Sequence, residues 1–104
     1  MSADFNHAAD DGEEIIRILS VQLGLTRRQA EVLHWVAQGK TNEETATILG
    51  CGYQTIKTHL KDIYLRLGVN NRAGAIGAAY DMLYRQLRRK SSPERGMPEK
   101  SPAQ

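Results

Sequence analysis

The feature that most constrains the fold of this chain is a helix-starting pattern that occurs at three places in its first 44 residues. In each case a residue with a short oxygen-bearing side chain precedes Glu or Gln by three positions: Asp11…Glu14, Thr26…Gln29 and Thr41…Glu44. The two side chains of such a pair can each bind a backbone N–H group that the first turn of a helix leaves without a partner. We interpret the pattern as the start of three helices.

Apolar periodicity and the placement of glycines set the other helix bounds. Gly24, Gly39 and Gly68 each follow an apolar run of helical spacing, and glycine commonly ends helices. We find no strand pattern and predict an all-α fold. The predicted helices cover residues 12–23, 27–37, 42–49, 53–67 and 72–89. We expect a disordered acidic arm at 1–11, a short amphipathic helix at 12–24, one domain at 25–90 and a disordered tail at 91–104.

The net charge of +2 is distributed unevenly along the chain. Residues 1–24 contain five acidic and one basic residue, whereas residues 25–92 contain eleven basic and five acidic residues. A basic domain behind an acidic arm is compatible with binding to nucleic acid. The single cysteine, Cys51, excludes an intramolecular disulfide and a multi-cysteine zinc site.

Several classes of protein lack their signals in this sequence. There is no secretory signal and no apolar stretch approaching the roughly 20 residues of a membrane helix, so we expect a cytosolic protein that does not bind a membrane. There is also no Gly-rich phosphate loop after a strand, no nucleophile with a base and no metal-ligand spacing. We therefore expect no enzymatic activity, no cofactor and no metal ion.

The segment 53–67 has the pattern of a DNA-reading helix. Two short helices joined by a glycine-containing turn, here Gly50-Cys51-Gly52, can place the second helix in the major groove. If the aliphatic stripe of this helix is buried, the opposite face presents Gln54, Lys57, Thr58 and Lys61. Lysine can donate to guanine, glutamine can pair with adenine, and the threonine methyl group can contact thymine. These four residues are our predicted base contacts.

Residues 25–79 resemble the LuxR-type (LuxR/GerE/NarL) helix-turn-helix domain. The matching segments are Leu25-Thr26-Arg27-Arg28, Glu31-Val32-Leu33, Ala37-Gln38-Gly39-Lys40-Thr41-Asn42-Glu43-Glu44, Thr55-Ile56-Lys57-Thr58-His59, Ile63, Arg66-Leu67 and Val69-Asn70-Asn71-Arg72. The resemblance implies a four-helix domain, here with an additional short N-terminal helix. It also implies that the third helix of that domain enters the major groove and that the fourth forms a homodimer. Thr45 departs from the pattern, because the family usually has a large aliphatic residue at this position.

Carried over by position, the resemblance implies two sets of DNA contacts. The base-contacting positions fall at Lys57, Thr58 and Lys61. The phosphate-contacting positions fall at Thr41, Asn42, Thr55 and Arg72.

The last predicted helix begins with small residues and continues with bulky ones. Its two interior glycines, Gly74 and Gly77, cost about 1 kcal/mol each relative to alanine, which close approach of another backbone would offset. We expect a symmetric dimer seam here, with packing inside one protomer as the alternative. The predicted seam consists of Ala75, Ala78, Ala79 and Met82.

These observations lead to two functional hypotheses. The first is a transcription regulator that binds double-stranded DNA as a homodimer. About 24 residues precede the domain, too few for a receiver or ligand-sensing domain, so we expect it to act alone. The second is an interaction protein that pairs through its last helix with RNA polymerase or a larger relative and does not itself read DNA.

Overall fold

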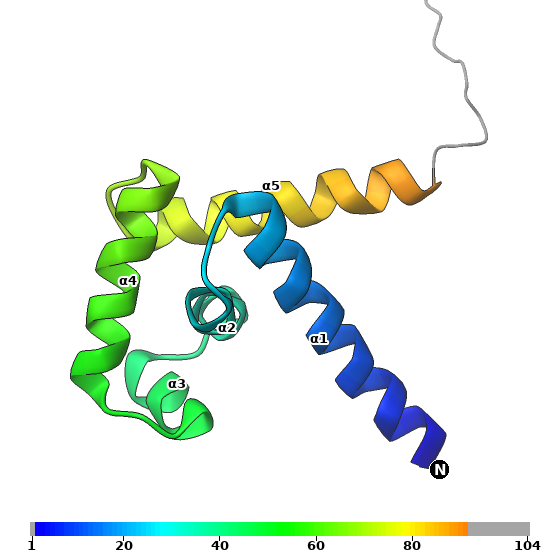
Figure 1. The fold of residues 1–104 in the computed structure, drawn as a ribbon, viewed down its shortest axis with the longest axis horizontal. Helices are drawn as coiled ribbons and strands as arrows, with labels where there is room; N and C mark the ends of the chain where they lie inside the picture. Colours follow the sequence, from blue (N-terminus) through cyan, green and yellow to red (C-terminus); the bar gives the residue numbers. More distant parts are fainter. Residues whose placement is uncertain (1, 92–104) are drawn as a thin grey trace, which may run out of the picture.

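The structure, a computed structural model, describes the backbone of residues 2–91 and the side chains of residues 12–89. Within that range all regular structure is helical, which confirms the predicted all-α fold. Of the predicted disordered tail at 91–104, Ser91 is the last residue of α5, and residues 92–104 lie outside the described residues. The five helices are α1 (Ser2–Leu23), α2 (Arg27–Ala37), α3 (Asn42–Leu49), α4 (Tyr53–Leu67) and α5 (Arg72–Ser91) (Figure 1).

The first helix is longer than predicted. It begins at Ser2, whereas the sequence pattern at Asp11 predicted a start near residue 12 after a disordered arm. Adding a turn to an existing helix costs far less than starting a new one, since propagation fixes one residue for each new hydrogen bond. The pattern at Asp11 therefore lies inside a helix.

The capping pairs predicted for α2 and α3 are both present. The Thr26 hydroxyl accepts a hydrogen bond from the Gln29 N–H group at 3.1 Å, and the Gln29 side chain accepts one from Thr26 at 3.0 Å. Thr41 and Glu44 form the same reciprocal pair before α3. By contrast, α4 begins after Gly52 without a side-chain cap. These local bonds explain why α2 and α3 begin where the sequence predicted.

The turn between α3 and α4 depends on Gly50. This residue has a φ of +71°, a conformation that side chains with a Cβ rarely adopt. It allows the next N–H group, that of Cys51, to bind the Ala46 carbonyl oxygen at 2.9 Å and so complete the last turn of α3. The chain can then reverse within a few residues and start α4.

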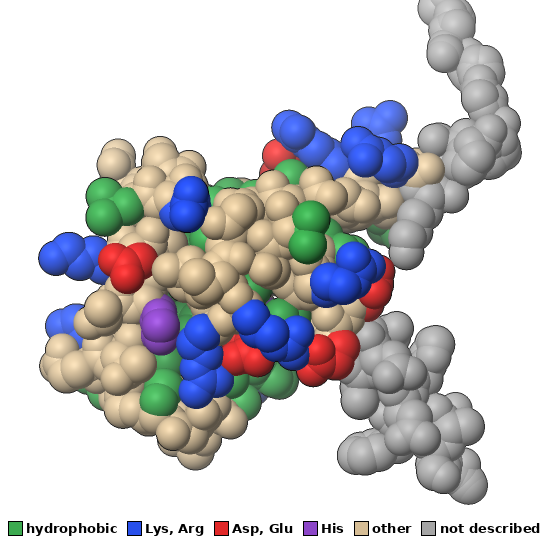
Figure 2. Space-filling model, in the orientation of Figure 1, with side chains coloured by type: hydrophobic (Ala, Val, Ile, Leu, Met, Phe, Trp, Pro, Cys, Tyr) green, Lys and Arg blue, Asp and Glu red, His purple; other side chains and the backbone are tan. Residues whose placement is uncertain are grey.

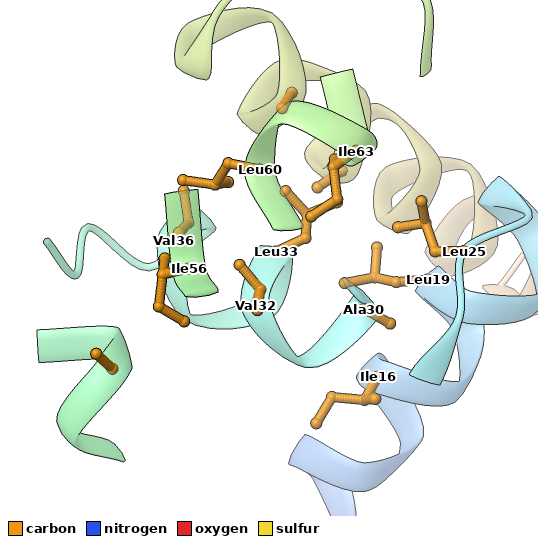
Figure 3. Close-up of a cluster of buried hydrophobic side chains, with 13 residues drawn as sticks. Ile16, Leu19, Leu25, Ala30, Val32, Leu33, Val36, Ile56, Leu60 and Ile63 are labelled. Atoms are coloured by element: carbon orange, nitrogen blue, oxygen red, sulfur yellow. The ribbon is translucent and has the colours of Figure 1, made fainter. Parts of the chain in front are cut away.

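The core forms around α2, which contacts each of the other four helices. In Figure 1 this helix is seen end-on at the centre of the molecule, with α1 on one side and α3 and α4 on the other. Figure 3 shows aliphatic side chains of α2 packed among those of its neighbours. Leu19 of α1, Leu33 of α2 and Ile63 of α4 are all fully buried. Ile16 is also buried, so α1 packs on the domain as its apolar stripe requires.

Thr45 is fully buried in α3. Its hydroxyl donates a 2.8 Å hydrogen bond to the Thr41 carbonyl oxygen one turn earlier. A buried hydroxyl costs little once it has such a partner. The threonine at a usually aliphatic position is therefore accommodated without an unsatisfied polar group.

Candidate nucleic-acid interface

Helix α4 has one buried side and one exposed side. Ile56 and Ile63 are fully buried and Leu60 is 4% exposed, so the aliphatic stripe faces α2 and α3. All four residues predicted to contact bases are exposed: Gln54, Lys57, Thr58 and Lys61. Figure 2 shows Lys and Arg side chains standing out along the edge of the molecule that α4 forms in Figure 1. This face carries donors and remains open to a ligand.

Tyr53, the first residue of α4, is a neighbour of this face that the sequence analysis missed. Its side chain is 42% exposed, and the Lys57 Nζ atom lies 5.7 Å from the centre of its ring. This distance is within the range of a cation–π interaction. The spacing of four residues on one helix was the signal that could have identified the pair.

Three of the four residues predicted to contact phosphate lie around one groove. Thr41, Asn42 and Arg72 line it together with Lys40, Glu43 and Tyr53, and its volume is about 370 Å³. Thr55 is exposed on α4 and does not line the groove. The start of α3, the start of α4 and the start of α5 thus meet around a single concave surface.

Arg72 supports this groove from within the protein. Its guanidinium donates one hydrogen bond to the Asn42 side-chain oxygen at 2.8 Å and another to the Lys40 carbonyl oxygen at 2.7 Å. Two of its five donors are therefore engaged, and the residue as a whole is half-buried. The structure gives Arg72 an internal role in addition to the phosphate contact predicted from sequence.

A second arginine joins α2 to the end of α3, the first helix of the helix-turn-helix. Arg28 of α2 donates a 3.0 Å hydrogen bond to the carbonyl oxygen of Leu49, the last residue of α3. It also forms a 2.9 Å ion pair with Glu31. Because a carbonyl at a helix C-terminus has no helical partner, this bond both satisfies it and fixes the end of α3 against α2.

The predicted dimer seam on α5 needs correction. Ala75 and Ala79 are fully buried inside the protomer, because this side of α5 packs against the protein's own core. Neither side chain is exposed to a second copy in this arrangement. Ala78 and Met82 are half-buried. A different stripe of α5 is exposed, and it consists of Ala73, Gly77, Tyr80, Tyr84 and Leu87.

The two glycines of α5 have different surroundings. A Cβ atom added to Gly74 would lie 2.9 Å from the Cβ of Val69 in the preceding loop, closer than such atoms approach. The close approach expected at this glycine therefore occurs inside the protomer. A Cβ atom on Gly77 would meet no atom within 4 Å. Gly77 thus leaves an open position on the exposed stripe of α5.

The contact between α1 and α2 includes charged and titratable groups. Arg27 at the start of α2 forms a 2.5 Å ion pair with Glu13 of α1. His34 of α2 is 9% exposed, lies 3.9 Å from the position that a Cβ on Gly12 would occupy, and makes an edge-to-face contact with Trp35. Burial lowers the pKa of His34, and the Glu13 carboxylate opposes that shift.

Residues 12–89 contain no group of three or more His, Cys, Asp or Glu side chains arranged to hold a metal ion. None of the helices in the described range has the length and apolar content required to cross a membrane.

Comparison with known proteins identifies the central segment. Residues 23–79 match the family described as "Bacterial regulatory proteins, luxR family". The chain is 32% identical over 72 residues to the transcriptional activator protein PhzR of Pseudomonas fluorescens, covering 69% of this chain and 30% of that protein. It is 41% identical over 58 residues to the transcriptional activator protein EsaR of Pantoea stewartii subsp. stewartii, covering 54% of this chain and 23% of that protein.

A response regulator is also similar to this chain. The nitrate/nitrite response regulator protein NarP of Escherichia coli (strain K12) is 39% identical over 51 residues, covering 49% of this chain and 24% of NarP. The chain thus spans less than a third of the length of these three relatives. No solved structure matches the chain significantly. Because the family match extends over more than half of its residues, this chain belongs to the luxR family of bacterial regulatory proteins.

Proposed function

We propose that this protein regulates transcription by binding a specific sequence of double-stranded DNA, with α4 in the major groove. The observation that carries the proposal is the division of α4, whose aliphatic side is buried while Lys57, Thr58 and Lys61 are exposed together. Side chains of these types can distinguish base edges in the major groove. Membership of the luxR family supports the same conclusion.

The groove beside α4 suits a phosphate of the DNA backbone. Thr41, Asn42 and Arg72 line it, Arg72 donates a hydrogen bond to Asn42, and Thr55 is exposed on α4. Hydroxyl, amide and guanidinium donors commonly bind phosphate oxygens and fix the position of a protein on a duplex. In this proposal these four residues set the register and α4 reads the bases.

We further propose that two copies pair through the exposed stripe of α5. Its members, Ala73, Gly77, Tyr80, Tyr84 and Leu87, are separated alternately by four and three residues. This spacing keeps a stripe on one side of a helix and is the pattern by which helices pair. Tyr80 and Tyr84 are 52% and 60% exposed in the protomer, so pairing would remove apolar surface from water. A symmetric dimer would then bind a two-fold symmetric site.

The proposal is tested by selecting bound fragments from random duplex DNA with the purified protein. The selected sequence then serves as the ligand for Lys57→Ala and Lys61→Ala, which should each lower affinity at least about fivefold, since a specific base contact contributes about 1–3 kcal/mol. Arg17→Ala is the control, because it removes the same charge from exposed α1. Circular dichroism checks that all variants remain folded. Unchanged affinity in both lysine variants would refute the assigned reading face.

A second function is favoured by a different observation. Tyr84 and Leu87 are exposed on a part of α5 that lies beyond the family match at residues 23–79. This surface suits an interaction protein that pairs with RNA polymerase or a larger relative and does not read DNA. Salt dependence separates the alternatives, because the log of the DNA affinity falls with log salt at about −0.9 per phosphate neutralised. No DNA binding at low salt would favour the interaction protein.

A further inference from the structure

The tyrosine at the start of α4 stands between the two parts of the proposed DNA-binding surface. On one side its ring lies beneath the Lys57 ammonium group, with 5.7 Å between the Nζ atom and the ring centre. On the other side Tyr53 lines the groove that also contains Thr41, Asn42 and Arg72. Its position therefore connects the residue that would read a base with the residues that would bind the adjacent backbone.

The direction in which the ring holds the ammonium group follows from helix geometry. Side chains on a helix lean towards its N-terminus, so Lys57 reaches back one turn towards Tyr53. In helix-turn-helix proteins the N-terminal residues of the recognition helix contact the base edges. The aromatic ring therefore keeps the Lys57 ammonium group at the end of α4 that would enter the groove.

A lysine side chain without such a support loses conformational entropy when it binds a base. It has four flexible carbons and loses a large amount of rotamer entropy when it is fixed on one base. A ring that already restricts the ammonium group before binding reduces that loss. Within residues 12–89, no aromatic ring forms a cation–π contact with Lys61, one turn further along α4. The two lysines of this face therefore differ in how strongly an aromatic ring restrains their ammonium groups.

We propose that Tyr53 is a positioning residue for Lys57 and that base discrimination at the site read by Lys57 depends on the Tyr53 ring. The proposal rests on the proposed function, because it requires α4 to read DNA. It assigns to Tyr53 an action through Lys57 and not a base contact of its own. Cation–π interactions at exposed sites contribute about 0.5–1 kcal/mol, which corresponds to a change in affinity of roughly 2- to 5-fold.

The first experiment measures the geometry without DNA. Ring currents of Tyr53 should shift the ε-methylene protons of Lys57 upfield in the NMR spectrum of the free protein. The shift should persist in Tyr53→Phe and disappear in Tyr53→Leu, while the ε-methylene protons of Lys61 serve as an internal control in the same spectra. A Lys57 signal that does not respond to Tyr53→Leu would refute the positioning role, whatever the protein binds.

The second experiment is a double-mutant cycle on the selected duplex and on duplexes with single base-pair changes. Tyr53→Leu should reduce discrimination roughly 2- to 5-fold at the one base pair whose discrimination is lost in Lys57→Met. Tyr53→Phe should retain it, and Tyr53→Leu should have no further effect in the Lys57→Met background. Equal weakening on all duplexes, or additive effects in the double variant, would overturn the proposal. Absence of DNA binding by the unmodified protein would instead refute the proposed function itself.

Discussion

The guanidinium of Arg72 donates a 2.8 Å hydrogen bond to the side-chain oxygen of Asn42, which joins the first residue of α5 to the first residue of α3. A second bond from Arg72 reaches the carbonyl oxygen of Lys40. The two acceptors lie on either side of Thr41, whose side chain caps α3. One side chain from the last helix thus fixes the loop on which the proposed phosphate contacts lie.

Replacing Arg72 should therefore lower stability as well as DNA affinity. Arg72→Met removes both hydrogen bonds and leaves the Lys40 carbonyl without this partner, so we expect the free energy of unfolding to fall by about 1–3 kcal/mol. Urea denaturation measures this change. The control is Arg85→Met, which removes an exposed ion pair with Asp81 and should cost less than about 1 kcal/mol. Equal losses in the two variants would contradict the structural role of Arg72.

The glycines of α5 provide a matched pair of substitutions. Gly74→Ala should lower the free energy of unfolding by about 1–3 kcal/mol, because the new Cβ atom would collide with Val69 and force the loop to move. Gly77→Ala should raise it by up to about 1 kcal/mol, because the position is open and alanine favours the helix. Urea denaturation should be carried out at concentrations where sedimentation shows monomers. Similar effects at both positions would contradict the crowding at Gly74 and the open space at Gly77.

The corrected seam on α5 predicts the effect of a charge at Tyr84. Tyr84→Glu should weaken self-association more than about tenfold, because pairing would bury an unpaired carboxylate. Stability of the protomer should change little, since Tyr84 is 60% exposed. Sedimentation equilibrium measures the association. The control is Val21→Glu, at a 64% exposed position on α1, which should leave self-association unchanged. An equal loss of self-association in Val21→Glu would mean that the effect of the added charge is not local to α5.

Stability should depend on pH through His34. Its pKa in the folded protein is lowered by burial, so the unfolded chain binds more protons in the interval below the ordinary histidine pKa. The stabilisation is therefore present at pH above about 6.5 and decreases as the pH falls below this value. Urea denaturation between pH 7.5 and 5.5 should show a smaller decrease in His34→Gln than in the unmodified protein. Identical pH profiles would show that His34 does not titrate in this way.

The bounds of the central helices could be predicted from sequence because their signals are local. Thr26 and Thr41 find their capping partners three residues away, and the glycine after each helix marks its end within the same turn. The start of α1 was not predictable by this reasoning. The Asp11 pattern is compatible with a helix start and with a helix interior, and only the surrounding structure distinguishes them.

The face of α5 that packs inside the protomer was also beyond the sequence analysis. Small residues such as Ala75 and Ala79 suit a dimer seam and a crowded core equally well, and the choice depends on where α2 lies. The links made by Arg28 and Arg72 were missed for a related reason. Their acceptors include backbone carbonyl groups 21 and 32 residues away in the chain, and any residue type provides a carbonyl.

The missing side-chain cap before α4 has a consequence for how binding would be observed. Because Gly52 offers no side-chain oxygen, the first amides of α4 depend on water in the free protein, unlike those of α2 and α3. They should therefore exchange their hydrogens with solvent sooner than the first amides of the other two helices. In the complex that we propose, phosphate oxygens of the duplex would replace water as acceptors for these amides. The N-terminal end of α4 would then become rigid only when DNA binds.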